Sequence, residues 1–143
     1  MTSKTLLATV IVFTACSGDP VAPPGIHFPT YDAGGPHPLA LLDATLEVED
    51  GCVYIAKGGE RWIGLWPNDL RVELEGDLVQ IVDGDGQVLA AEGEPIRAGG
   101  GERRASELGG FAELEDWFGR IGGTRLPREC GDLTWQVSGI EPR

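Results

Sequence analysis

Turn-forming residues interrupt this chain too often for it to build long regular elements. Glycine occurs 22 times and proline 10 times among 143 residues. Glycine adopts turn conformations at little steric cost, and proline cannot donate a backbone hydrogen bond, so both residues tend to end helices and strands. Between them lie short runs in which apolar and polar side chains alternate, which is typical of half-buried strands. The pattern therefore predicts a mainly β domain.

Up to eight such runs follow residue 39. The clearest covers residues 70–74, where Leu70, Val72 and Leu74 alternate with charged side chains. The Asp-Gly-Asp-Gly sequence at 83–86 predicts a hairpin turn, because both residue types tolerate a positive φ. The three glycines at 99–101 predict another turn. The expected strands are residues 46–48, 52–57, 61–66, 70–74, 78–82, 88–91, 96–98 and 133–137.

One short helix is expected before the last strand. Phe111, Leu114, Trp117 and Phe118 recur at helical spacing and form one apolar face, and glycines follow at 119, 122 and 123. Many short strands and a single helix favour a small antiparallel barrel or a rolled sheet. An OB-like barrel is the nearest named shape.

The first sixteen residues predict export. Lys4 and the amino terminus supply positive charge, and residues 6–13 form an apolar run that is far shorter than the ~20 residues needed to cross a bilayer. The sequence Phe13-Thr14-Ala15-Cys16 resembles the lipobox of bacterial lipoproteins, with phenylalanine where leucine is usual. This resemblance implies that residues 1–15 are a signal peptide, removed before Cys16, and that the sulfur of Cys16 carries a lipid. A plain secretory signal is the alternative.

The cysteine count agrees with a lipidated Cys16. The chain has three cysteines, so acylation of Cys16 leaves Cys52 and Cys130. In an oxidising compartment these two are expected to form a disulfide. Two separate buried thiols are the alternative.

The composition changes near residue 39. Residues 16–38 hold six of the ten prolines, four glycines and both histidines of the chain, His27 and His37. This composition predicts a solvated tether rather than a metal site. Residues 39–143 form the expected β domain.

Charge limits the classes of partner. The chain carries 11 basic and 23 acidic residues, a formal net charge of -12. Nucleic-acid binding and electrostatic docking on anionic lipid both need clustered lysine and arginine, so both are disfavoured. We therefore expect contact with a membrane only through the N-terminal lipid anchor.

Groups typical of catalysis are scarce. No histidine occurs after residue 38, and neither Ser106 nor Ser138 lies in a nucleophile motif. The glycines at 99–101 lack the Gly-Lys-Ser/Thr sequence of a phosphate loop. We expect no enzyme activity, no cofactor and no metal. The alternative is a small carboxylate- or metal-dependent envelope hydrolase that uses paired acids such as Glu113 and Asp116.

Trp62 and Trp66 are the candidate ligand-binding residues. They share one face of the expected strand 61–66, where two indoles could stack on a sugar or line a peptide groove. The alternative is that both fill the core of a small barrel.

Several short segments of the expected β domain are distinctive together: Gly51-Cys52, Leu65-Trp66-Pro67, Gly76-Asp77-Leu78-Val79, the Asp-Gly turn, the glycines at 99–101 and Leu126-Pro127-Arg128-Glu129-Cys130. They resemble small exported bacterial domains that have no assigned activity. With the lipobox-like sequence, they lead us to expect a lipid-anchored, non-catalytic binding or interaction module of the bacterial cell envelope, facing the periplasm or the exterior, with an envelope protein or a glycan as partner.

Overall fold

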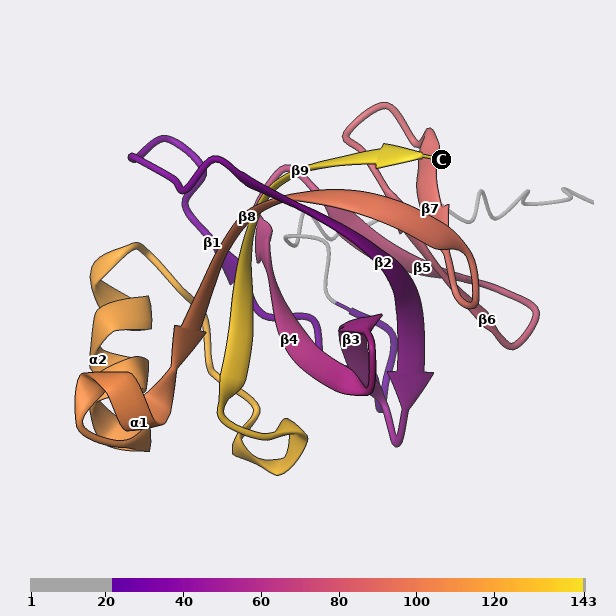
Figure 1. Ribbon diagram of the computed structural model, residues 1–143. Coiled ribbons are helices and arrows are strands. Elements are labelled where there is room, and N and C mark those ends of the chain that lie inside the picture. Colours follow the sequence, from indigo (N-terminus) through magenta and orange to yellow (C-terminus); the bar gives the residue numbers. More distant parts are fainter. Residues whose placement is uncertain (1–21, 143) are drawn as a thin grey trace, which may run out of the picture.

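The computed structural model describes residues 22–142 (Figure 1). The expected signal peptide, Cys16 and the rest of the first 21 residues lie outside the described residues. Within them, nine strands, two α-helices and one 3-10 turn follow one another along the chain.

Six strands form one rolled sheet in the order β1-β4-β3-β2-β8-β9. β9 pairs with β8 along its length and also runs parallel to three residues of β4, Ile63–Leu65, so the two sides of the roll meet. The mainly β, rolled sheet is confirmed. A fully closed antiparallel barrel is not formed, because this contact is short and parallel. The strands are β1 (Thr30–Tyr31), β2 (Ala40–Glu49), β3 (Cys52–Lys57), β4 (Glu60–Pro67), β8 (Pro95–Arg104) and β9 (Leu133–Pro142).

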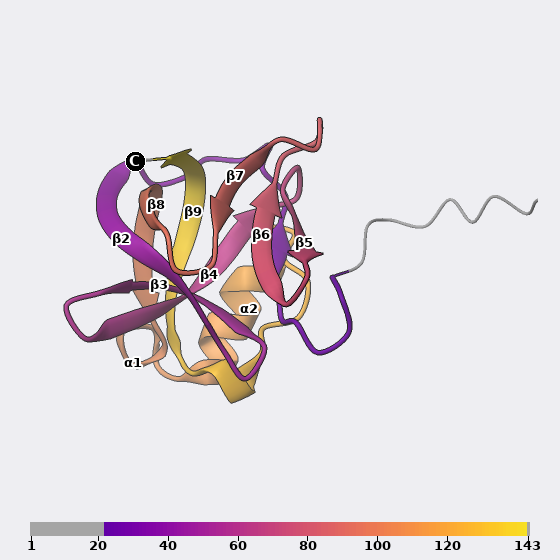
Figure 2. The same cartoon turned by 90° about the vertical axis from the view of Figure 1, so that its right-hand side faces the viewer.

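A second sheet of three strands lies against the roll (Figure 2). It contains β5 (Arg71–Glu75), β6 (Leu78–Val82) and β7 (Val88–Ala91), paired antiparallel in the order β5-β6-β7. Val79 and Ile81 of β6 belong to the same buried cluster as Leu46 of β2 and Ile55 of β3. The two sheets therefore share one core, and side chains fill the interior of the roll.

The expected hairpin turn at 83–86 is confirmed, because it joins β6 to β7. The Oδ1 atom of Asp83 accepts the backbone N–H groups of Asp85 and Gln87, both at 2.9 Å. This arrangement is the Asx turn that aspartate stabilises through its own side chain. The carboxylate of Asp83 is thus used to hold the turn.

The expected turn at the three glycines 99–101 is wrong, because these residues lie inside β8. The ladder between β8 and β9 shifts register between Gly99 and Gly100. Gly100 has a φ of 148°, and a Cβ there would lie 1.9 Å from the carbonyl oxygen of Gln136. Glycine is needed here because two strands approach closely at a bulge.

Two helices and a single 3-10 turn occupy the connection between β8 and β9: α1 (Ala105–Leu108), α2 (Phe111–Arg120) and η1 (Arg128–Cys130). α2 is the expected helix. Its apolar side chains Leu114 and Phe118 are buried against Tyr31 and Leu65. The sequence did not predict α1 because four residues are too few to show a helical period.

The N-terminal part of the described chain packs on the roll. Phe28 stacks on Trp66 with ring centroids 5.1 Å apart. Tyr31 is buried, and its hydroxyl donates to the carbonyl of Val137 at 2.5 Å. The backbone N–H of His27 donates to the carbonyl of Gly51 at 2.8 Å. The folded domain thus begins before residue 39, and it includes residues that the proline content assigned to a tether.

Candidate functional site

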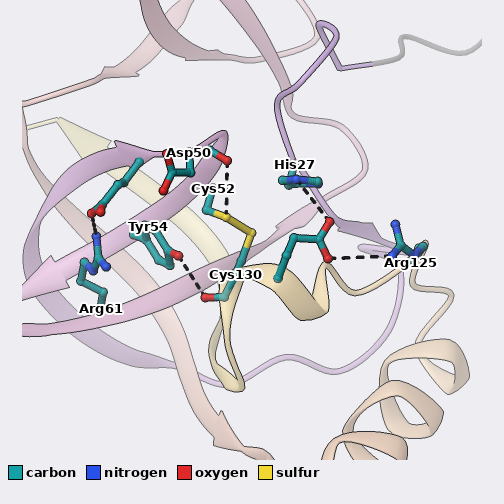
Figure 3. The surroundings of a disulfide bond; sticks show 9 residues. His27, Asp50, Cys52, Tyr54, Arg61, Arg125 and Cys130 are labelled. Carbon is teal, nitrogen blue, oxygen red and sulfur yellow. Dashed lines mark hydrogen bonds and ion pairs between the residues drawn. A yellow bond between two sulfur atoms is a disulfide. The ribbon is translucent and has the colours of Figure 1, made fainter.

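The disulfide between Cys52 and Cys130 confirms the expected pairing (Figure 3). It joins the start of β3 to η1, with the two Cα atoms 5.6 Å apart. Tyr54 and Ile63 complete a small buried cluster around it. The hydroxyl of Tyr54 donates to the carbonyl of Cys130 at 3.0 Å, so η1 is held to β3 by a hydrogen bond as well as by the disulfide.

His27 lies beside this disulfide. Its Nε2 atom is 3.3 Å from Oε1 of Glu129, while Oε2 of Glu129 is 3.8 Å from the guanidinium of Arg125. The backbone N–H of Glu129 lowers the pKa of its own carboxyl group, and the charges of His27 and Arg125 act in the same direction. The hollow next to these residues has a volume of only about 220 Å³. The arrangement fastens the N-terminal segment to η1.

The candidate ligand-binding pair, Trp62 and Trp66, lies in the core. Their side chains are 6% and 0% exposed. β4 is covered on both faces: the two tryptophans point into the roll, while Leu65 packs under α2. An exposed stacking platform is therefore wrong, because the roll needs large side chains to fill its interior. The ring of Trp66 lies so close to Gly64 that a Cβ there would be 2.3 Å from it.

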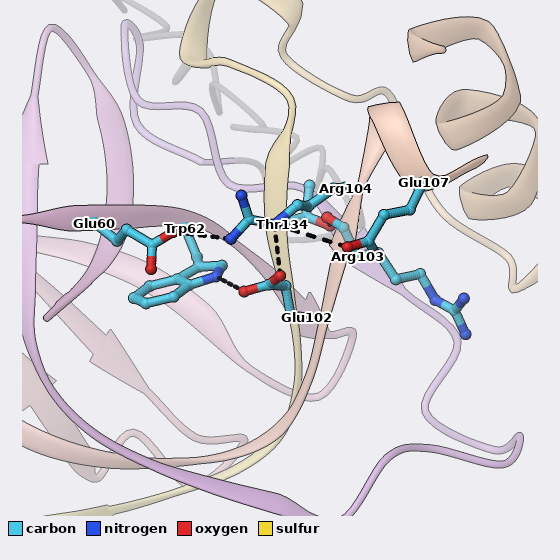
Figure 4. A network of polar contacts seen from close by, with 7 residues as sticks. All are labelled: Glu60, Trp62, Glu102, Arg103, Arg104, Glu107 and Thr134. Atoms are coloured by element: carbon cyan, nitrogen blue, oxygen red, sulfur yellow. Dashed lines mark hydrogen bonds and ion pairs between the residues drawn. The ribbon is translucent and has the colours of Figure 1, made fainter. Parts of the chain in front are cut away.

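Trp62 also takes part in a polar network that the sequence did not reveal (Figure 4). Its Nε1 donates to Oε2 of Glu102 at 2.7 Å, and Nε of Arg104 donates to Oε1 of the same carboxylate at 2.7 Å. Arg104 also reaches Glu60 at 2.8 Å. The hydrogen bond from Arg104, and next the one from Trp62, lower the pKa of Glu102. The carboxylate is therefore held in its ionised form.

A groove of about 440 Å³ lies between β2 and the hairpin that joins β3 to β4. Several charged side chains line it, and most of them are paired. Asp43 accepts a hydrogen bond from Arg97 at 2.9 Å, Glu60 is bound by Arg104, and Arg61 is paired with Glu49. Lys57 has no ion-pair partner among residues 22–142. The charged residues on the groove wall are Asp43, Glu47, Lys57, Glu60 and Arg61.

The groove adjoins the first half of β2. Thr45–Glu49 pair with β3 on one side, whereas Ala40–Ala44 pair with β8 alone among the described strands. Leu39 is 82% exposed and Leu41 is 68% exposed. The sequence pattern did not predict the first part of β2, because it placed the first strand at residues 46–48. The alternation of Leu42, Ala44 and Leu46 with Asp43 and Thr45 was the available signal.

A second hollow of about 440 Å³ lies between the N-terminal segment, the end of α2 and β9. The buried side chains of Tyr31 and Gln136 form part of its wall. Arg120 at its rim is paired with Asp116 one helical turn away. This hollow thus offers buried polar groups, whereas the groove beside β2 adjoins the exposed side chains of Leu39 and Leu41.

No family model, curated protein or solved structure matches this chain. In the part of the chain that the structure describes, no helix is long and apolar enough to span a membrane. Among the same residues, no three histidine, cysteine, aspartate or glutamate side chains are grouped so that they could hold a metal ion.

Proposed function

We propose that this protein is a lipid-anchored, non-catalytic interaction module on the outward-facing side of a bacterial membrane. The observation that carries the proposal is the disulfide between Cys52 and Cys130. Disulfides persist in oxidising compartments, so this one supports export from the cytoplasm. It also uses two of the three cysteines and leaves Cys16, in its lipobox-like sequence, as the odd one.

The carboxylate chemistry supports a non-catalytic role. A carboxyl group that acts as a general acid near neutral pH needs a raised pKa. The pKa of Glu102 and that of Glu129 are instead lowered, each by hydrogen bonds and by neighbouring cations. Both groups hold the fold together, because Glu102 binds two side chains of the roll and Glu129 binds His27.

The docked N-terminal segment sets how far the domain could stand from a membrane. Its packing begins at Ala22, six residues after Cys16. Six residues of fully extended chain span at most roughly 22 Å. A lipid on Cys16 would therefore keep the domain close to the bilayer.

Intact mass spectrometry of the protein extracted from membranes tests this proposal. We expect a chain that begins at Cys16, carries added acyl mass, and gains two hydrogens on reduction. The matched control is Cys16→Ser, which should lose the acyl mass and leave the membrane fraction while keeping the gain of two hydrogens. An unacylated wild-type chain, or one that still begins at Met1, would refute the anchor.

A further inference from the structure

We propose that the hollow between the N-terminal segment, the end of α2 and β9 binds a neutral sugar. The proposal rests on the interaction function inferred above, and it names a class of ligand and the site that takes it. The hollow has a volume of about 440 Å³, which lies within the range of small-molecule sites, about 300–1,000 Å³.

Gln136 places a buried amide in the wall of this hollow. Its neighbours in β9, Trp135 and Val137, point into the roll, so Gln136 points to the outer face of the sheet. There it lies beside Leu65 of β4, which belongs to the apolar layer under α2. Gln136 is only 3% exposed. Because α2 ends at Arg120, the hollow opens beside the helix and reaches Gln136.

Only part of this amide is used within the protein. The hydroxyl of Tyr31 donates its proton to the carbonyl of Val137 at 2.5 Å, so its oxygen can accept an N–H from Gln136. Burial raises the pKa of Tyr31, and the hydrogen bond from Gln136 acts in the opposite direction. A primary amide has two N–H donors and an acceptor oxygen. The Gln136 side chain has no second partner among residues 22–142, and a buried polar group is costly unless something binds it.

Asp32 supplies a further hydrogen-bonding group at the mouth of the hollow. Its Oδ1 accepts the backbone N–H of Gly34 at 3.0 Å, which leaves Oδ2 for a ligand. The backbone N–H of Asp32 donates to the carbonyl of Ile121 at 3.1 Å. The mouth is therefore fixed to the end of α2 before a ligand arrives, and a fixed site loses less entropy on binding.

The polarity of the hollow favours a neutral ligand over an ion. Its buried groups, the amide of Gln136 and the hydroxyl of Tyr31, are uncharged. An ion beside them would lose its water without gaining a counter-charge. Asp32 and Arg120 lie at the exposed mouth, one of each sign, and Arg120 is already paired with Asp116.

Hydroxyl groups on adjacent carbons of a sugar match these features. Each hydroxyl both donates and accepts, so a neighbouring pair fits the N–H and the oxygen that Gln136 presents side by side. Ile121 and Pro36 add apolar surface to the wall, on which the C–H groups of a sugar ring can pack. Small-molecule sites commonly combine apolar walls with a few polar groups that fix the orientation of the ligand.

The test uses the full chain with Cys16→Ser, which cannot be acylated at that residue, observed by ¹H–¹⁵N NMR. Glucose, galactose, mannose and N-acetylglucosamine are added separately as their methyl glycosides. We expect at least one of them to shift the side-chain NH₂ signals of Gln136 and the backbone amides of residues 34–35 and 119–122. Glucuronic acid and glucosamine, which carry a charge on the same kind of ring, should bind about tenfold more weakly or worse.

Longer sugars distinguish a free sugar from a unit of a glycan. Cellobiose, lactose and N,N′-diacetylchitobiose contain the same units within a chain. A disaccharide that binds at least as tightly as its single unit assigns the hollow to a glycan, whereas weaker binding of the disaccharide assigns it to a free sugar.

Three variants locate the site. Gln136→Leu should weaken binding about tenfold or more, because two hydrogen bonds to the ligand are lost. Leucine suits the apolar layer around this position, and urea unfolding checks that the variant folds. Asp32→Ala, at an exposed residue, should also weaken binding and does not depend on that check. Gln80→Leu makes the same change on β6, outside the hollow, and should leave binding unchanged.

Three results would overturn the proposal: no neutral sugar shifts the side-chain signals of Gln136, a charged sugar binds as tightly as its neutral counterpart, or both Gln136→Leu and Asp32→Ala bind like the unchanged chain. None of these outcomes depends on the acyl mass at Cys16, so the two proposals fail separately.

Discussion

Removal of the disulfide between Cys52 and Cys130 should cost this domain a large part of its stability. The two cysteines are 78 positions apart and join the beginning of β3 to the turn before β9. In the chain-entropy model, a cross-link that closes a loop of this length stabilises the folded state by about 4.5 kcal/mol. Domains of this size unfold with a total of about 5–15 kcal/mol, so the double variant Cys52→Ala/Cys130→Ala should be marginally stable.

Urea unfolding followed by tryptophan fluorescence measures this loss. Trp62, Trp66 and Trp135 are all buried and report on the core. With a denaturant dependence of about 2 kcal/mol/M, the midpoint should fall by about 2 M. The dependence itself should rise, because the unlinked chain exposes more surface when it unfolds.

The control for this experiment is Cys16→Ala, which removes the cysteine that the disulfide does not use. It should leave the urea midpoint unchanged. A loss below about 1 kcal/mol in the double variant would refute the loop-closure argument. It would show that the other contacts of η1, such as the hydrogen bond from Tyr54, already restrain this part of the chain.

Three further perturbations test the packing and the polar network. Phe28→Ala should cost about 2 kcal/mol in urea unfolding, because a half-buried ring that stacks on Trp66 is lost. Gly64→Ala should cost about 1–3 kcal/mol, because its Cβ would lie 2.3 Å from the ring of Trp66. Glu102 has a lowered pKa in the folded state, so its contribution is present above the ordinary value near 4.5 and disappears as pH falls through the folded value. Glu102→Gln should therefore flatten the decline of the unfolding free energy below about pH 4.5, with the fluorescence of Trp62 as readout.

Matched variants separate these effects from general sensitivity to substitution. His37→Ala, at an exposed residue of the same N-terminal segment, should change stability by less than about 0.5 kcal/mol. Gly119→Ala, where a Cβ meets nothing within 4 Å, should be neutral or stabilising. If Phe28→Ala unfolds at the same urea concentration as the unchanged chain, the contact with Trp66 does not stabilise the domain. The N-terminal segment would then act as a tether.

Local pattern in the sequence was enough to predict most of the strands and the longer helix. The alternation of apolar and polar side chains over residues 70–74 and 78–82 predicts a half-buried strand without knowledge of its neighbours. Such a strand needs only one apolar surface on which to pack. The Asp-Gly turn at 83–86 depends on residues within the turn itself. The pairing of Cys52 with Cys130 followed from the count of cysteines once Cys16 was set aside.

Contacts between distant residues decided the rest. Periodicity shows that Trp62 and Trp66 share a face, but only the rolled sheet makes that face the interior. The docking of the N-terminal segment depends on the ring of Trp66, which lies 38 positions after Phe28. The glycines at 99–101 form a strand because they pair with β9. At Gly100 the carbonyl oxygen of Gln136 leaves no room for a Cβ. The first half of β2 pairs with β8 and its second half with β3, a relation between strands that no single stretch of sequence contains.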